Sequence, residues 1–124
     1  MFTIHQLLIF AARGGNLDLM RERIAAGADV SYVDVDHGSA LFAAIAGHHL
    51  SAVEFLIANG ADVRMADAHG QGPLEYSLRH GDDNITAALL RASARLKPHA
   101  LSRFRKLLSE HLRRRGVQHE LPTA

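Results

Sequence analysis

The sequence contains no cysteine, and this absence excludes two classes of protein, those held by disulfides and those with a thiolate metal site. Neither a disulfide framework nor a thiolate metal site can form without thiols. The composition is compatible with a reducing compartment, and we expect a cytoplasmic protein. Aromatic residues make up only 6% of a chain that is 48% hydrophobic. That balance favours closely packed helices of alanine and leucine over a β-sandwich, whose strands are rich in aromatic residues.

Long hydrophobic runs are also absent. No stretch of the sequence approaches the roughly 18 apolar residues that a membrane-spanning helix needs. The segment from Met1 to Ala12 is apolar, but it lacks the positively charged start of a secretory signal. We therefore expect it to belong to the mature fold, and we expect no transmembrane segment. A length of 124 residues suits one domain with a modest core.

The formal net charge of +1 hides an uneven distribution along the chain. Residues 1–90 hold five arginines and eleven acidic residues, a net charge of −6. Residues 91–124 hold nine basic and two acidic residues, a net charge of +7. An acidic body followed by a basic segment indicates that the segment binds a partner or docks on the body itself.

What the sequence does contain is one short stretch that occurs twice. Residues 27–30 read Gly-Ala-Asp-Val, and residues 60–63, which lie 33 positions later, read the same. Each copy follows an apolar run with helical spacing, so Gly27 and Gly60 are predicted to end helices in the left-handed conformation. A fixed period of this length indicates a solenoid, in which units too small to fold alone stack into a continuous core.

The same period holds outside the repeated stretch. Each unit is predicted to form two short helices, the first with small side chains and the second with larger aliphatic ones. The residues that recur at this spacing are Leu8, Leu41 and Leu74, then Ala11, Ala44 and Ser77, then Ile24, Ile57 and Leu90. Asn16 and either Asp82 or Asp83 are predicted to cap second helices, and Pro73 to open the first helix of the third unit.

This pattern resembles the ankyrin repeat over roughly residues 3–94. The positions of the family pattern that the second and third units keep are Asp34, Leu41, Ala44, His49, Asp67, Gly70, Pro73 and Leu74. No unit has the complete Thr-Pro-Leu-His turn of the family. The resemblance implies an all-α solenoid of about three helix-turn-helix repeats with short hairpin loops, spanning residues 1–97.

In ankyrin proteins the hairpin loops and first helices line a concave face that binds other proteins. The resemblance therefore implies a protein–protein interaction module, and the candidate partner-binding residues are Val35, Asp36, His37, Phe42, His69, Gln71, Glu75, Arg79 and His80. Phe42 stands where the family usually has histidine. We expect either a solvent-facing anchor for the partner or a ring packed on the neighbouring helix. The alternating valines and aspartates of residues 33–36 fit a contact loop and a short local strand equally well.

A different pattern begins at Pro98. Apolar residues recur there at helical spacing as far as Gly116, namely Leu101, Phe104, Leu107, Leu108 and Leu112. We expect residues 98–116 to form a basic amphipathic helix that caps the third unit, and residues 117–124 to form a flexible tail. The alternative is an adaptor whose basic helix contacts nucleic acid or an anionic membrane. The acidic body argues against nucleic acid.

Nine histidines invite a metal hypothesis, but their spacing argues against one. His48 and His49 are adjacent and would point apart on a helix, and the sequence has no His-x3-His or HExxH pair. A site assembled from His37, His69 and His80 stays geometrically possible. The sequence also has no phosphate-binding loop followed by lysine and no nucleophile elbow. We expect no enzyme activity, no catalytic residue, no metal and no cofactor.

The resemblance also bears on biological role, although a fold alone does not name a partner. Small ankyrin chains without cysteine or targeting signals look bacterial. In that setting one role is that of a cognate inhibitor, such as an immunity protein that occludes a toxin. The partner would then be another protein, a toxin or an effector.

Overall fold

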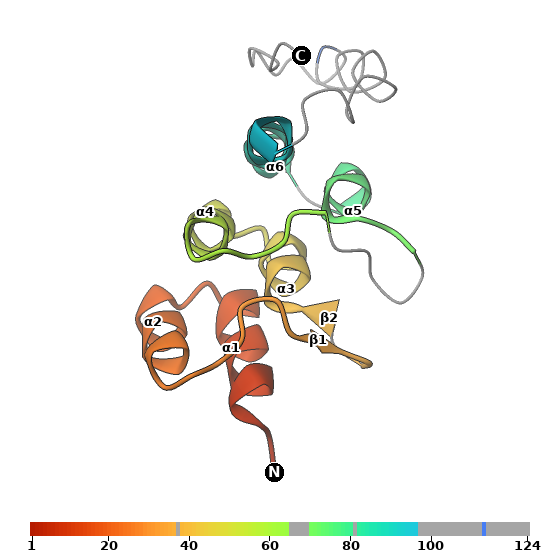
Figure 1. Cartoon of the computed structure of the whole chain (residues 1–124). Coiled ribbons are helices and arrows are strands. Elements are labelled where there is room, and N and C mark those ends of the chain that lie inside the picture. The colour runs from red at the N-terminus through yellow and green to blue at the C-terminus, as the bar shows by residue number, and fades with distance from the viewer. Residues whose placement is uncertain (37, 65–69, 81, 97–112, 114–124) are drawn as a thin grey trace.

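The computed structural model describes residues 1–36, 38–64, 70–80, 82–96 and 113. This part of the chain forms three stacked helix pairs and one small sheet (Figure 1). The pairs are α1 (Ile4–Arg13) with α2 (Leu17–Ala25), α3 (Ala40–Ala46) with α4 (Leu50–Ala58), and α5 (Pro73–His80) with α6 (Asp83–Leu96). Strands β1 (Val33–Asp34) and β2 (Gly38–Ser39) form an antiparallel hairpin that leads into α3. The predicted all-α repeat solenoid is confirmed.

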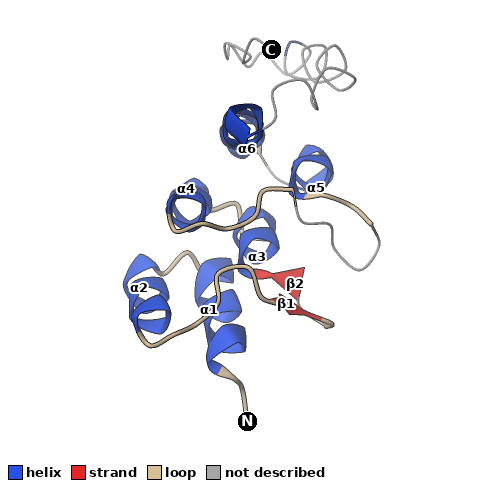
Figure 2. Ribbon diagram, viewed as in Figure 1, coloured by secondary structure: helices blue, strands red, loops and turns tan. Residues whose placement is uncertain are grey.

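The helices stand in two columns (Figure 2). The inner helices α1, α3 and α5 pack on one another, and the outer helices α2, α4 and α6 stack beside them. One apolar core runs through all three pairs, and its largest members are at most 1% exposed: Leu8, Ile9, Met20, Ile45, Val53, Leu56, Ile85 and Leu89. Each such side chain contributes about 1.5–3 kcal/mol when buried, so stacking supplies the stability that a single pair lacks.

The repeated Gly-Ala-Asp-Val stretch ends the first two outer helices in the same way. Gly27 and Gly60 have φ values of 105° and 92°, which confirms the predicted left-handed stops. In both copies the N–H of the following alanine donates to the carbonyl five residues back, at 2.9 Å. Asp29 and Asp62 then each accept, through Oδ1, the N–H two residues ahead at 2.9 Å. The recurring turn directs the chain towards the next pair.

The starts of the outer helices also recur every 33 residues. Asn16 and Asp82 each accept the N–H three residues ahead through a side-chain oxygen, at 3.1 and 2.8 Å, which confirms both as caps. His49 occupies the equivalent position of the middle pair and makes no such hydrogen bond. Its ring lies against Gly15 and Gly47, where a Cβ atom would collide with it. The middle pair therefore replaces a cap with close packing.

The third pair ends differently from the first two. Helix α6 has 14 residues, whereas α2 and α4 have nine each. The added length agrees with the sequence, because residues 92–94 read Ala-Ser-Ala where the earlier units have their stop glycine. The predicted capping helix over residues 98–116 and the predicted tail over residues 117–124 lie outside the described residues, apart from the exposed Arg113. Both stay predictions.

Candidate protein-binding surface

The β1–β2 hairpin presents an exposed apolar side chain on an anchored turn. Val35 lies between the two strands and is 91% exposed. The N–H of Asp36 donates to Oδ1 of Asp34 at 2.8 Å, which fixes the turn. Asp34 is buried, and its Oδ2 accepts a hydrogen bond from Nε2 of Gln6 on α1 at 2.8 Å. The hairpin is thus tied to the first helix, so less freedom is lost when a partner binds.

Helix α5 supplies a second group of exposed side chains. Glu75 and Arg79 lie one helical turn apart, and both are exposed, as is His80. The ring of His80 lies 4.7 Å from that of Tyr76, tilted by 44°. Gln71 is half-buried in the segment that leads into the helix. Arg79 and His80 also occupy the last turn, where positive charge stabilises the helix dipole, so part of their role is structural.

Phe42 does not belong to the exposed surface, and the expectation of a solvent-facing anchor is wrong. Its side chain is only 6% exposed. The ring meets that of Tyr76 edge to face, with centroids 5.2 Å apart and planes at 85°. Because α5 packs directly on α3, it brings Tyr76 over this position. The alternative of a ring packed on the neighbouring helix is correct.

The remaining candidates divide between two elements. The hairpin turn carries Val35 and Asp36, and α5 with its leading segment carries Gln71, Glu75, Arg79 and His80. We call these six residues the inner face, because α5 belongs to the inner column and the hairpin projects from that column (Figure 1). His37 and His69 lie outside the described residues, and their predicted role is untested.

Sequence reasoning missed one cation at the edge of this surface. Arg13 is exposed in the last turn of α1, two periods before Arg79, with Ala46 at the equivalent position of α3. Extending the 33-residue period backward from Arg79 would have found it. At the C-terminal ends of the inner helices, Arg13 of α1 and Arg79 of α5 therefore lie on either side of Ala46 of α3.

The described residues offer neither a metal cluster nor a membrane-spanning helix. Within the described part of the chain, no group of three or more histidines or carboxylates could hold a metal ion. The suggested triad of His37, His69 and His80 has only its last member there. None of the described helices is long and apolar enough to cross a bilayer.

Stacked helix pairs with a hairpin projecting from the inner column define a repeat scaffold. A family model for ankyrin repeats in three copies matches residues 8–99. The chain belongs to the ankyrin repeat family, which confirms the resemblance seen in the sequence. Ankyrin repeats are protein–protein interaction modules, and this class of function follows from the family.

Curated relatives share the repeat array. The RelA-associated inhibitor of Mus musculus is 35% identical over 96 residues, which cover 77% of this chain and 12% of the relative. The potassium channel AKT1 of Arabidopsis thaliana is 35% identical over 77 residues, 62% of this chain and 9% of the channel. The Arf-GAP with coiled-coil, ANK repeat and PH domain-containing protein 2 of Rattus norvegicus is 42% identical over 64 residues, 50% of this chain and 8% of the relative. The chain thus spans about a tenth of each relative's length.

Proposed function

We propose that the chain binds a partner protein through its inner face. The carrying observation is the hairpin turn, where Val35 is 91% exposed although the turn is anchored through buried Asp34. Exposed Glu75 and Arg79 on α5 add both signs of charge. A surface with apolar, acidic and basic groups suits a folded protein partner. Because these groups stand on packed elements, little conformational freedom is lost on binding.

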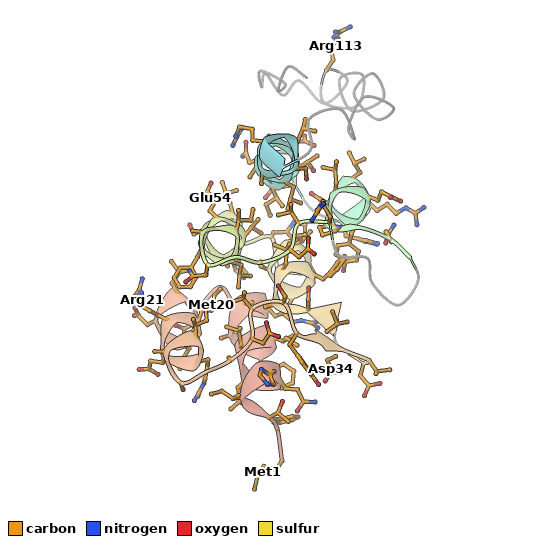
Figure 3. The ribbon with its side chains drawn as sticks, in the orientation of Figure 1. Met1, Met20, Arg21, Asp34, Glu54 and Arg113 are labelled. Carbon is orange, nitrogen blue, oxygen red and sulfur yellow. The ribbon has the colours of Figure 1, made fainter. Side chains whose placement is uncertain are left out.

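The test is a double variant, Val35→Ala with Arg79→Ala, assayed against a partner captured from the native source and then purified. We expect its affinity to fall at least about tenfold, or by about 1.4 kcal/mol, because the variant truncates the exposed apolar residue and the arginine on which the proposed contact depends most. Glu54→Ala is the matched control, since Glu54 is exposed on α4 in the outer column (Figure 3). Equal affinity of the double variant and the wild type would move the interface to another surface.

A finer proposal is that the chain acts as a cognate inhibitor, such as an immunity protein that occludes a toxin or effector. Its support is the small ankyrin array itself and a relative whose name describes an inhibitor, the RelA-associated inhibitor of Mus musculus. An occluding inhibitor should abolish the activity of its partner at a one-to-one ratio. Full activity in a saturated complex would contradict inhibition while leaving the binding proposal standing.

A second candidate is an adaptor for nucleic acid or anionic membrane, favoured by the net charge of +7 on residues 91–124. Binding through phosphates releases counterions, so it should weaken steeply as salt rises. A cognate inhibitor should bind neither DNA nor anionic vesicles. Tight, salt-sensitive binding to either probe, retained in the Val35→Ala/Arg79→Ala variant, would favour the adaptor.

A further inference from the structure

Helix α4 ends in the one Asn-Gly pair of the sequence. Asn59 is exposed at the end of the helix, and Gly60 follows it with a φ of 92°. An asparagine before a glycine is chemically labile, because glycine has no side chain that would shield its backbone nitrogen from the neighbouring carboxamide. Beyond its chain neighbours, no atom lies within 4 Å of the place that a Cβ of Gly60 would take. The pair is therefore open to reaction and to water.

The other two asparagines of the chain lack this feature. Asn16 precedes Leu17, and Asn84 precedes Ile85. Both of these following residues carry a branched side chain beside the nitrogen that would have to react. All three asparagines are exposed, so exposure does not distinguish them. The residue that follows does.

The folded turn holds the two reacting groups of the pair apart. Nδ2 of Asn59 donates to the carbonyl of Phe55 at 2.8 Å, and the N–H of Gly60 donates to the carbonyl of Ile57 at 3.1 Å. The ψ of Asn59 is 13°. Because its backbone nitrogen and Cβ lie about 120° apart around the tetrahedral Cα, this value turns the Gly60 nitrogen away from the side chain. The reaction therefore requires the end of α4 to open first.

We propose that Asn59 is a site of spontaneous deamidation and that opening of the end of α4 controls its rate. In the opened turn the Gly60 nitrogen loses its proton to solvent and attacks Cγ of Asn59. A bond forms between that nitrogen and Cγ, the bond from Cγ to Nδ2 breaks, and the leaving nitrogen takes up a proton from solvent to depart as ammonia. Water then opens the five-membered succinimide at either carbonyl, which gives aspartate or isoaspartate at position 59.

Both products weaken the end of the helix. Aspartate has no amide to donate to Phe55, and it places a negative charge at the C-terminal end of α4, where the helix dipole disfavours it. Isoaspartate adds a methylene to the main chain just before the turn that positions Asp62. The N–H of Asp62 donates to Oγ of Ser31 in the preceding turn at 3.3 Å. Deamidation therefore loosens the junction between successive units.

The test is storage of the purified full chain at neutral pH and body temperature, followed by peptide mass mapping that separates the amide, aspartate and isoaspartate forms. Asn59 should be modified first, with Asn16 and Asn84 as controls within the same chain. In guanidinium chloride, where the turn is lost, Asn59 should react at least about tenfold faster, which corresponds to an opening free energy of about 1.4 kcal/mol. The rate should also rise with pH, because the nucleophile is the deprotonated nitrogen.

Two variants at the same repeat position test the opening step. Val63→Ala removes a side chain that is only 4% exposed from the turn that follows Asn59. It should accelerate the reaction in the folded chain at least about threefold, because the end of α4 then opens more often. Val30→Ala, one period earlier and half-buried, is the matched control and should leave the rate nearly unchanged. Asn59→Ala removes the reaction and keeps the turn, since Ala26 occupies this position in the first unit.

Three results would overturn the proposal. The first is an Asn59 that reacts no faster than Asn16 and Asn84 in the folded chain. The second is an equal rate in the folded and the unfolded chain, which would show that the turn gives no protection. The third is an equal rate in the Val63→Ala and Val30→Ala proteins, which would separate the reaction from opening at the end of α4.

Discussion

The second and third helix pairs share one architecture but have opposite inner helices. Six of the seven residues of α3 are buried, and all seven are apolar. Helix α5 has charged and polar residues along its length, and only Pro73 and Ser77 are buried. Helix α3 lies between α1 and α5, and this location removes its side chains from any partner. The position of a helix in the stack, as well as the position of a residue in the repeat, therefore determines which residues can bind.

The largest effect is expected when the same repeat position is truncated in both helices. Phe42→Ala should lower the free energy of unfolding by about 3–5 kcal/mol, because it empties a buried site against Tyr76. Glu75→Ala, one period later and exposed, should change it by no more than about 0.5 kcal/mol. Urea denaturation followed by circular dichroism measures both. A small loss for Phe42→Ala would mean that its ring contributes little to packing.

The periodic features of the fold could be predicted from the sequence because they depend on local chemistry. A left-handed glycine, an N-cap or a helix-opening proline acts within a few residues, so the structure confirms the predicted roles of Gly27, Gly60, Asn16 and Pro73. The burial of Phe42 could not be assigned in the same way. It depends on where α5 places Tyr76, which is a contact between units and not a property of one unit.

The candidate site was predictable to a similar degree. The hairpin and the exposed side of α5 follow from the repeat pattern, and Val35, Glu75, Arg79 and His80 are exposed as a contact role requires. The exposure of Leu19 beside its buried counterparts Ala52 and Ile85 could not be predicted, because it depends on the place of the pair in the stack and not on the repeat pattern.

A smaller effect is expected from the polar pair inside the third unit. The hydroxyl oxygens of Ser77 and Thr86 lie 2.6 Å apart, and both residues are 1% exposed. Their counterparts in the middle pair are the apolar Ala44 and Val53. Thr86→Val alone should cost about 1–3 kcal/mol, because it leaves a buried hydroxyl without this partner.

The double variant Ser77→Ala with Thr86→Val gives the third pair the side chains of the second. It should recover most of the loss caused by Thr86→Val, since no buried hydroxyl then lacks its partner. A double-mutant cycle from urea denaturation of the four proteins measures the coupling. If the two single losses simply add, the hydroxyl pair does not act as a unit and the contrast between the two pairs is one of volume alone.

The smallest predicted change removes a strained residue from the middle pair. His48 is the one non-glycine residue with a positive φ among those described, at 60°, and Gly15 occupies the same turn of the first pair at 69°. A left-handed conformation costs a residue with a Cβ about 1–2 kcal/mol. Replacing His48 by glycine removes this cost, but part of the gain is lost because glycine has more conformational freedom in the unfolded chain. His48→Gly should therefore raise the free energy of unfolding by about 0.5–1 kcal/mol and raise the melting temperature.

Gly60→Ala is the control of opposite sign. It adds a Cβ at a φ of 92° with no atom within 4 Å, so any loss of stability comes from the backbone alone. A destabilised His48→Gly protein would show that the exposed imidazole contributes more than its backbone strain costs.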